Sequence, residues 1–311
     1  MPLDPSVKRL LDRLAVARSA GSREQSVAER RRSLAELMQL AGSPEPVARA
    51  EDRTIAGAAG ALTIRIYTPG ALRSEPSAGL VYLHGGGLVA GSLDSHDAVA
   101  RALANRGACR VVSVAYRLAP EHPFPAAIED ATAAVRYLST HARDFAIDPQ
   151  RLGVAGDSAG AALAAVVCQT VAAAGAPRLA LQLLLCPIMD HAGQSASRGE
   201  FADGYLLDSG MLEQDLRWYL PPGVPPDDPR VSPLRAGDLS GVAPAAIHTA
   251  EFDPVRDDGL SYAQSLQRAG VPATYRCHSG MIHLFYALGR LIPYAQLALT
   301  RIGVDIQTAL S

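Results

Sequence analysis

The spacing of apolar residues changes near residue 50 of this 311-residue chain. In residues 6–41 they recur every three or four positions, which predicts two amphipathic helices separated near Ala20 to Ser22. Beyond residue 50, short apolar runs alternate with helical patterns, which predicts an α/β domain whose parallel sheet is covered by helices on both faces. The predicted strands are 62–67, 79–83, 110–115, 151–155, 179–185, 244–249 and 273–277, and the predicted helices are 96–106, 126–142, 158–174, 257–269 and 290–309.

The stretch 191–228 interrupts this alternation. It places Tyr205, Trp218 and Tyr219 in a pattern typical of a helix and then continues with a proline-rich run. Because the stretch fits neither a strand of the sheet nor one of its covering helices, we interpret it as an excursion from the sheet that forms part of a lid.

Composition narrows the classes of function. The net charge is −2, and the basic run from Arg23 to Arg32 is interleaved with Glu, so it predicts a solvated helix face and no nucleic-acid partner. The four cysteines lack CxxC spacing, which favours buried free thiols in a reducing cytosol over disulfides or zinc ligands. The N-terminus lacks the layout of a signal peptide, and no apolar run approaches the ~18 residues of a membrane span. We therefore expect a cytoplasmic protein without stable membrane association.

A candidate nucleophile stands between a predicted strand and a predicted helix. The residues from Gly156 to Gly160 spell G-D-S-A-G, and a serine between two glycines at such a turn is typical of the nucleophile elbow of serine hydrolases. The turn exposes Ser158 and puts its amide at a helix N-terminus, where anions are favoured. A motif this short also arises by chance in a chain with 27 glycines, so the assignment depends on further residues.

A glycine loop, His84–Gly87, directly follows the predicted strand 79–83. Its backbone N–H groups could stabilise the oxyanion of a tetrahedral intermediate, with Ala159 as the donor from the other side. Two other interpretations are a plain glycine turn and a dinucleotide-binding loop. The spacing of these glycines with Gly91 departs from G-x-G-x-x-G, and no suitable strand ending in Asp or Glu follows, which disfavours the dinucleotide loop.

The acid and the base must come from strand ends later in the chain, because α/β-hydrolases follow the order serine, acid, histidine. Asp253 closely follows a predicted strand and precedes a proline, which stops a sheet, so it is the better candidate acid. Asp257 and Asp258 lie a few residues later and could instead cap the next helix. Both His278 and His283 follow the last predicted strand, and the order of residues leaves both open as the base.

With Ser158, the glycine loop and Asp253 in place, the chain resembles the bacterial hormone-sensitive-lipase-like family of esterases, from about residue 4 to its last helix. The resemblance selects Asp253 as the triad acid and His283 as the base. The segments that carry it are HGGGLVAGSLD (84–94), YRLAPEHPFPA (116–126), GDSAG (156–160), AEFDPVRD (250–257) and GMIH (280–283).

The resemblance also has implications for the fold and the oxyanion hole. Within the glycine loop it favours Gly86 and Gly87 over Gly85 as donors beside Ala159. A homodimer through an edge strand near the C-terminus is a further implication. The implied fold is an eight-stranded α/β-hydrolase core of residues 49–190 and 229–311, with a helical cap of residues 1–48 and 191–228.

The chain departs from the family's pattern close to the expected pocket. Leu284 stands where the family usually has glycine, and Leu88 stands where an aromatic residue is common. These departures predict an altered loop beside the base and an acyl pocket that is more open or more polar than usual. Polar residues also replace aromatic positions of the cap: Glu213, Gln214 and Asp215.

The expected pocket is built from residues next to these motifs. Asp157 is expected to support the site from behind rather than to act as the triad acid. The candidate pocket residues are His84, Leu88, Asp157, Tyr205, Leu206, Trp218, Leu284 and Phe285.

These residues predict a serine carboxylesterase that hydrolyses short- to medium-chain esters through an acyl-enzyme, with a small-molecule ester as its partner and neither metal nor organic cofactor. An amidase or formamidase would need the same triad, so that alternative stays open. A non-hydrolytic small-molecule receptor is disfavoured because all three triad positions are filled. The physiological substrate and its acyl chain length cannot be derived from one sequence.

Overall fold

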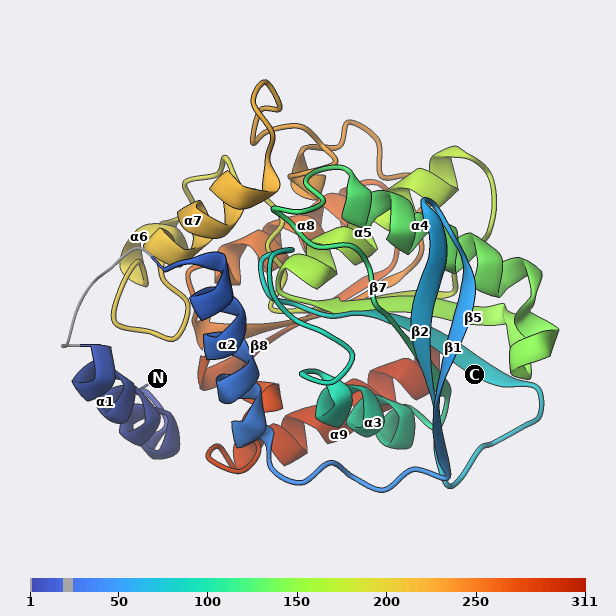
Figure 1. Ribbon diagram of the computed structural model, residues 1–311, viewed down its shortest axis with the longest axis horizontal. Coiled ribbons are helices and arrows are strands. Elements are labelled where there is room, and N and C mark those ends of the chain that lie inside the picture. The colour runs from blue at the N-terminus through green and yellow to red at the C-terminus, as the bar shows by residue number, and fades with distance from the viewer. Residues whose placement is uncertain (1, 19–24) are drawn as a thin grey trace.

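An eight-stranded sheet runs through the computed structural model, which describes residues 2–18 and 25–311 (Figure 1). The strand order is β1-β2-β4-β3-β5-β6-β7-β8. β1, β2 and β4 pair in antiparallel fashion and the other neighbours are parallel, so the predicted α/β sheet is confirmed as mostly parallel. The strands are β1 (Arg49–Gly57), β2 (Gly60–Thr68), β3 (Ser77–Leu83), β4 (Arg110–Val114), β5 (Ile147–Asp157), β6 (Leu181–Leu185), β7 (Ala245–Phe252) and β8 (Ala273–Ile282).

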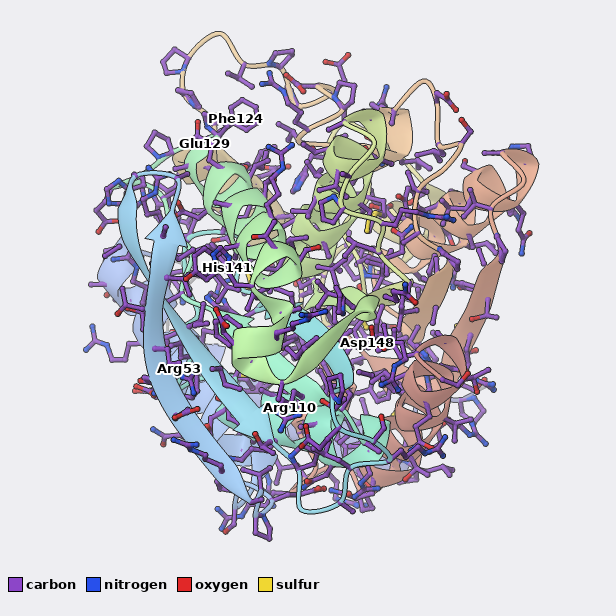
Figure 2. The ribbon with its side chains drawn as sticks, turned by 90° about the vertical axis from the view of Figure 1, so that its right-hand side faces the viewer. Arg53, Arg110, Phe124, Glu129, His141 and Asp148 are labelled. Atoms are coloured by element: carbon purple, nitrogen blue, oxygen red, sulfur yellow. The ribbon has the colours of Figure 1, made fainter. Side chains whose placement is uncertain are left out.

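The first strand was absent from the predicted elements. β1 lies at the edge of the sheet, where its Arg53 is labelled in Figure 2, and it pairs with β2 from Arg49–Thr68 to Gly57–Gly60. Most of its side chains are exposed, and Ile55 is its one buried residue. An edge strand of an antiparallel pair can face water, so it need not carry the apolar run by which buried strands are detected.

Helices cover both faces of the sheet (Figure 1). The alternation along β3 shows how the two layers are separated, because Val81 and Leu83 pack into one hydrophobic cluster while Leu80 and Tyr82 pack into the other. No helix in the described part of the chain combines the length and the apolar character needed to cross a bilayer. One face carries α4 (Ala126–Thr140), α5 (Ala159–Ala173) and α8 (Arg256–Arg268), and the other carries α3 (Asp97–Gly107) and α9 (Tyr294–Ala309). The short 3-10 helices are η1 (Gln39–Ala41), η2 (Ala142–Phe145), η3 (Pro233–Arg235) and η4 (Phe285–Ala287).

Four further helices, which we call the cap helices, lie toward one end of the sheet (Figure 1): α1 (Pro5–Arg18), α2 (Val27–Met38), α6 (Ala196–Glu200) and α7 (Ser209–Tyr219). α2 begins with a capping box, in which the Ser26 side chain accepts from the Glu29 amide and the Glu29 carboxylate accepts from the Ser26 amide. The predicted break between the first two helices lies outside the described residues. Tyr205 was predicted to be helical, but it lies in a bend between α6 and α7.

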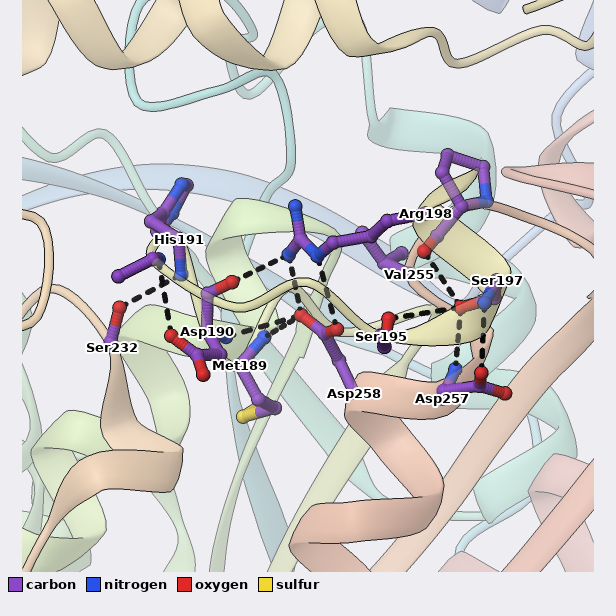
Figure 3. Close-up of polar contacts among 12 residues, drawn as sticks. Met189, Asp190, His191, Ser195, Ser197, Arg198, Ser232, Val255, Asp257 and Asp258 are labelled. Carbon is purple, nitrogen blue, oxygen red and sulfur yellow. Dashed lines mark hydrogen bonds and ion pairs between the residues drawn. The ribbon is translucent and has the colours of Figure 1, made fainter. Parts of the chain in front are cut away.

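Two contacts fasten the cap helices to the core. The Asp4 amide donates to the Gly280 carbonyl at 3.1 Å, which joins the start of α1 to β8. In α8, Asp258 accepts from the Met189 amide at 3.0 Å and from the Arg198 guanidinium at 2.7 Å (Figure 3). The segment that leads into α6 is therefore held against the core by a buried carboxylate.

Candidate active site

Ser158 occupies a one-residue turn between β5 and α5. Its φ is 54° and its ψ is −123°, a backbone conformation that few residues other than glycine adopt. A Cβ atom at Gly156 would collide with the Gly160 carbonyl, and one at Gly160 would collide with the Leu83 carbonyl. The two glycines therefore permit the turn that the G-x-S-x-G pattern predicts.

The structure brings the three predicted triad residues together. The Nε2 atom of His283 lies 2.9 Å from the Ser158 Oγ, and its Nδ1 lies 2.7 Å from the Asp253 Oδ2. The other Asp253 oxygen accepts from the Val255 amide at 3.0 Å, which fixes the carboxylate. All three triad side chains are buried, and Ser158 is only 6% exposed. The base and the serine are thus aligned in a site that is largely removed from solvent.

The alternative candidates for the triad acid and base bind other residues. Asp257 accepts from the Ser197 amide at 2.9 Å, and Asp258 binds Arg198, so both carboxylates hold the cap rather than the histidine (Figure 3). The Nε2 of His278 lies 3.0 Å from the Nδ1 of His248. Burial, together with the neighbouring His248, lowers the pKa of His278 to about 3. His278 therefore belongs to a separate buried cluster.

The glycine loop presents two unbonded amides to the site. Within the described residues, the N–H groups of Gly86 and Gly87 donate no hydrogen bond, and both glycines have φ in the left-handed region, at 119° and 68°. Ala159 is the first residue of α5, where an amide has no partner inside the helix. Gly85 differs from its neighbours, because its amide donates to the Asp157 Oδ1 at 2.9 Å. The prediction that included Gly85 among the oxyanion donors is therefore wrong.

Behind the loop lies a buried polar cluster. Asp157 is fully buried and accepts from the Tyr82 hydroxyl at 2.5 Å. Burial raises the pKa of Asp157, but His96 and Tyr82 outweigh that effect and hold it below its usual value. His84 lies in the same cluster, where burial lowers its pKa to about 4 with a contribution from His96, and its carbonyl accepts from the Tyr116 hydroxyl at 2.6 Å. Asp157 and His84 support the loop from its rear side, and neither lines the cavity in front.

A cavity of about 440 Å³ opens in front of Ser158 and His283. Among the candidate pocket residues, those that line it are Leu88, Leu206 and Leu284. Those that do not are His84, Asp157, Tyr205, Trp218 and Phe285. The cavity wall that faces the triad comes mainly from α2 and α7: Arg30, Ser33, Leu34, Glu36, Leu37, Met211, Leu212, Asp215, Leu216 and Tyr219.

Packing accounts for the aromatic residues that lie outside the cavity. Tyr205 stacks against Phe252, with ring centroids 5.8 Å apart. Phe285 is fully buried and packs against His278, at 4.8 Å. The position of Trp218 outside the cavity follows from the periodicity of α7. The face of α7 toward the cavity is formed by Leu212, Asp215, Leu216 and Tyr219, and Trp218 lies beside that face.

The polar cap residues take three different positions. Glu213 is exposed on the outside, and Gln214 is buried and donates to the Gln25 carbonyl at 2.8 Å. Asp215 lies in the cavity wall, where Arg30 binds it with two nitrogens, at 3.0 Å from Nε to Oδ1 and 2.8 Å from Nη2 to Oδ2. Burial raises the pKa of Asp215, and Arg30 opposes that rise.

Arg30 is one of several cavity residues that the sequence did not predict. It stands in the basic run that was predicted to be a solvated helix face, yet it is only 7% exposed. Its neighbour Arg31 follows the prediction more closely, with a partly exposed ion pair to Glu121. The Arg30 partner lies 185 positions away in the chain, so no local pattern could have pointed to it.

One group of possible metal ligands was found within the described residues: Cys186, Asp253 and His283, with one ligand atom from each within 4.8 Å of the others. Both ring nitrogens of His283 already lie within hydrogen-bond distance of triad partners. Burial, together with Asp253, raises the pKa of the Cys186 thiol. The arrangement therefore fits a hydrogen-bonded triad better than a metal centre.

Comparisons with known proteins agree with this geometry. A family model described as alpha/beta hydrolase fold matches residues 80–287. The chain is 40% identical over 301 residues to carboxylesterase NlhH of Mycobacterium tuberculosis, covering 94% of this chain and 92% of that protein. It is 37% identical over 321 residues to an ethyl acetate hydrolase of Pseudomonas putida, covering 99% of both. The crystal structure of the LAE6 Ser161Ala mutant, an alpha/beta hydrolase enzyme from the metagenome of Lake Arreo, matches with a TM-score of 0.94 at 38% identity, covering 98% of both chains.

Proposed function

Since the chain belongs to the hormone-sensitive-lipase-like branch of the α/β-hydrolase family and is a carboxylic ester hydrolase, we propose that it acts through Ser158, His283 and Asp253 on short- to medium-chain esters. The observation that carries the proposal is the unbroken chain of contacts from Ser158 Oγ through His283 to Asp253. Such a chain is the arrangement by which a neutral serine becomes a nucleophile.

The first step forms the acyl-enzyme. His283 Nε2 takes the proton of Ser158 Oγ as that oxygen attacks the ester carbonyl carbon, and a tetrahedral intermediate results. Asp253 holds the ring so that Nδ1 carries the other proton, and it stabilises the imidazolium that forms. The imidazolium then donates its proton to the departing alkoxide, and the acyl group stays on Ser158.

The oxyanion is stabilised by the amides of Gly86, Gly87 and Ala159. These groups line the same cavity as Ser158, and the two loop amides have no competing partner among the described residues. By analogy with other serine hydrolases, each donor of this kind contributes about 3 kcal/mol to lowering the barrier. A water molecule that loses its proton to His283 repeats the attack on the acyl-enzyme and releases the acid.

The preference for short to medium chains is supported by the size of the cavity. Its volume of about 440 Å³ lies toward the lower end of ligand pockets, and leucines form much of its wall. We assign residues 1–48 and 191–228 to one cap over this cavity. Cytoplasmic location and homodimer formation stay predictions from the sequence.

Replacement of the serine tests the proposal. Ser158→Ala should abolish hydrolysis of p-nitrophenyl butyrate, because the nucleophile is gone. Ser113→Ala is the matched control: that serine is also buried but lies in β4, its hydroxyl has no partner among the described residues, and its removal should leave activity unchanged. Activity retained by Ser158→Ala would contradict the proposal. A series of p-nitrophenyl esters from acetyl to palmitoyl would test the chain-length preference, and a matched anilide would measure amide cleavage.

A further inference from the structure

The Arg30 guanidinium is only partly used by its ion pair. An arginine has five N–H donors, and those of Nε and Nη2 bind Asp215. The Nη1 nitrogen donates no hydrogen bond to any residue that the structure describes. The N–H groups of this nitrogen are therefore available to an acceptor that comes from outside the protein.

The free nitrogen faces the space where substrate would bind. Arg30 is 7% exposed and lines the cavity in front of Ser158. Nη1 does not belong to the fully enclosed polar atoms without a partner, so it keeps some contact with open space. Because Arg30 lines this cavity, we infer that the cavity is the space that the Nη1 donors reach.

The ion pair lies close to the reacting groups. A Cβ atom at Gly87 would collide with the Asp215 carboxylate, so this carboxylate sits directly against a proposed oxyanion donor. Arg30 binds the same carboxylate, with its Nη2 at 2.8 Å from Oδ2. A substrate atom that binds Arg30 should therefore be separated from the reacting ester carbonyl by only a few covalent bonds.

We propose that Nη1 of Arg30 is a subsite for a second oxygen of the substrate, so that the preferred esters carry an ether, ketone or hydroxyl oxygen near the reacting ester group. This inference rests on the proposed function of Ser158. A neutral oxygen fits better than a carboxylate, because Asp215 already balances the arginine charge and would repel an anion. An oxygen that reaches Nη1 gains a hydrogen bond that a methylene cannot make.

The test compares esters that differ only by a methylene replaced by oxygen. The pairs are p-nitrophenyl butyrate with methoxyacetate, p-nitrophenyl pentanoate with 3-methoxypropionate, and butyl butyrate with 2-methoxyethyl butyrate. The first two pairs place the oxygen on the acyl side and the third places it on the alcohol side. For each pair the ratio of kcat/KM values is measured in several variants, so that the intrinsic reactivity of each ester cancels.

The informative variants share a neutral residue at position 215. Asp215→Asn keeps the guanidinium, whereas Arg30→Met/Asp215→Asn removes it and leaves an unbranched side chain without donors. In at least one pair, the preference for the ether should be about tenfold or more weaker in the double variant than in Asp215→Asn, the size expected for a charged hydrogen bond. Ratios that agree within about twofold in all three pairs would overturn the subsite.

A second measurement does not depend on the folding of the double variant. Asp215→Asn leaves the Arg30 charge unbalanced, so hydrolysis of the anionic ester monoethyl succinate, relative to ethyl pentanoate, should rise about tenfold over the wild-type ratio. An unchanged ratio would mean that the guanidinium does not face the substrate. The Ser158→Ala control separates the two proposals, because activity that persists in it overturns the triad, whereas ester ratios insensitive to Arg30 overturn only the subsite.

Discussion

The two walls of the cavity are built in different ways. The core wall carries Ser158, His283 and the glycine loop at the ends of strands. A strained turn presents the serine, the loop leaves two amides unbonded, and Asp253 holds His283. The cap wall comes from α2 and α7, which meet through the Arg30–Asp215 pair across 185 positions of sequence. The comparison teaches that the chemistry depends on strand ends and the turns that follow them, whereas the boundary of the substrate site depends on a contact between two helices far apart in the sequence. Changes in the core wall should therefore alter kcat, and changes in the cap wall should alter stability and selectivity.

The largest effect is expected on the core wall. Asp253→Asn should lower kcat by roughly 10⁴-fold, because an amide favours the wrong tautomer of His283. Steady-state kinetics with p-nitrophenyl butyrate measure the change. The matched control is Asp257→Asn, a nearby carboxylate that binds the cap segment, and it should keep kcat within about tenfold of the wild-type value. An equal loss of kcat in both variants would show that Asp253 is not the triad acid.

On the cap wall, Arg30→Met should lower the free energy of unfolding by about 3–5 kcal/mol, because the buried Asp215 loses its counter-charge. The double variant Arg30→Met/Asp215→Asn should recover most of that loss, since no unpaired charge remains. Urea unfolding of both proteins measures the difference. If the single and the double variant are equally unstable, the two residues do not act as a pair and the cap wall is held by its leucines.

The contrast between the walls also explains what the sequence could predict. Ser158 and Asp253 each follow a buried strand in a short recognisable segment, so their meeting at one sheet edge follows from the order of the strands. The same order left His278 and His283 both open as the base, and the family resemblance selected His283. β1 escaped prediction because its residues are mostly exposed. Two features depend on partners far away in the chain, which hydrophobic periodicity does not reveal. These are the hydrogen bond of the Gly85 amide to Asp157 and the burial of Arg30 against Asp215.

A pH-dependent prediction concerns the support of the core wall. Burial lowers the pKa of His84 from 6.5 to about 4, so the unfolded chain binds a proton more readily than the folded one. The stability contributed by the neutral histidine is fully present above pH 6.5 and is lost as the pH falls toward 4. At pH 5 the loss is about 2 kcal/mol. The difference in unfolding free energy between pH 7 and pH 5 should thus be about 2 kcal/mol smaller in His84→Asn, and an equal difference in both proteins would contradict this origin.

The smallest effect concerns Leu284, which has the left-handed φ of 59° at a position where the resemblance predicts glycine. The loop beside His283 thus keeps a conformation suited to glycine, although the residue is a leucine. Leu284→Gly and Leu284→Ala remove nearly the same bulk from the cavity, so their difference isolates the backbone. The glycine variant should be more stable by about 1 kcal/mol in thermal or urea unfolding, the reverse of the usual order of these residues. An alanine variant of equal or greater stability would show that the loop is unstrained.

The hydrogen bond from the Asp4 amide to the Gly280 carbonyl has a consequence for how the protein folds during its synthesis. It joins the beginning of the chain to the strand that delivers His283. A ribosome makes the N-terminus first, so the apolar face of α1, with Val7, must wait for β8 before it is buried. The nascent chain carries Ser158 without a base until His283 is added, 125 residues later. We expect hydrolysis to begin only after β8 and His283 have been made, with the closing of α1 and the arrival of the histidine as one event.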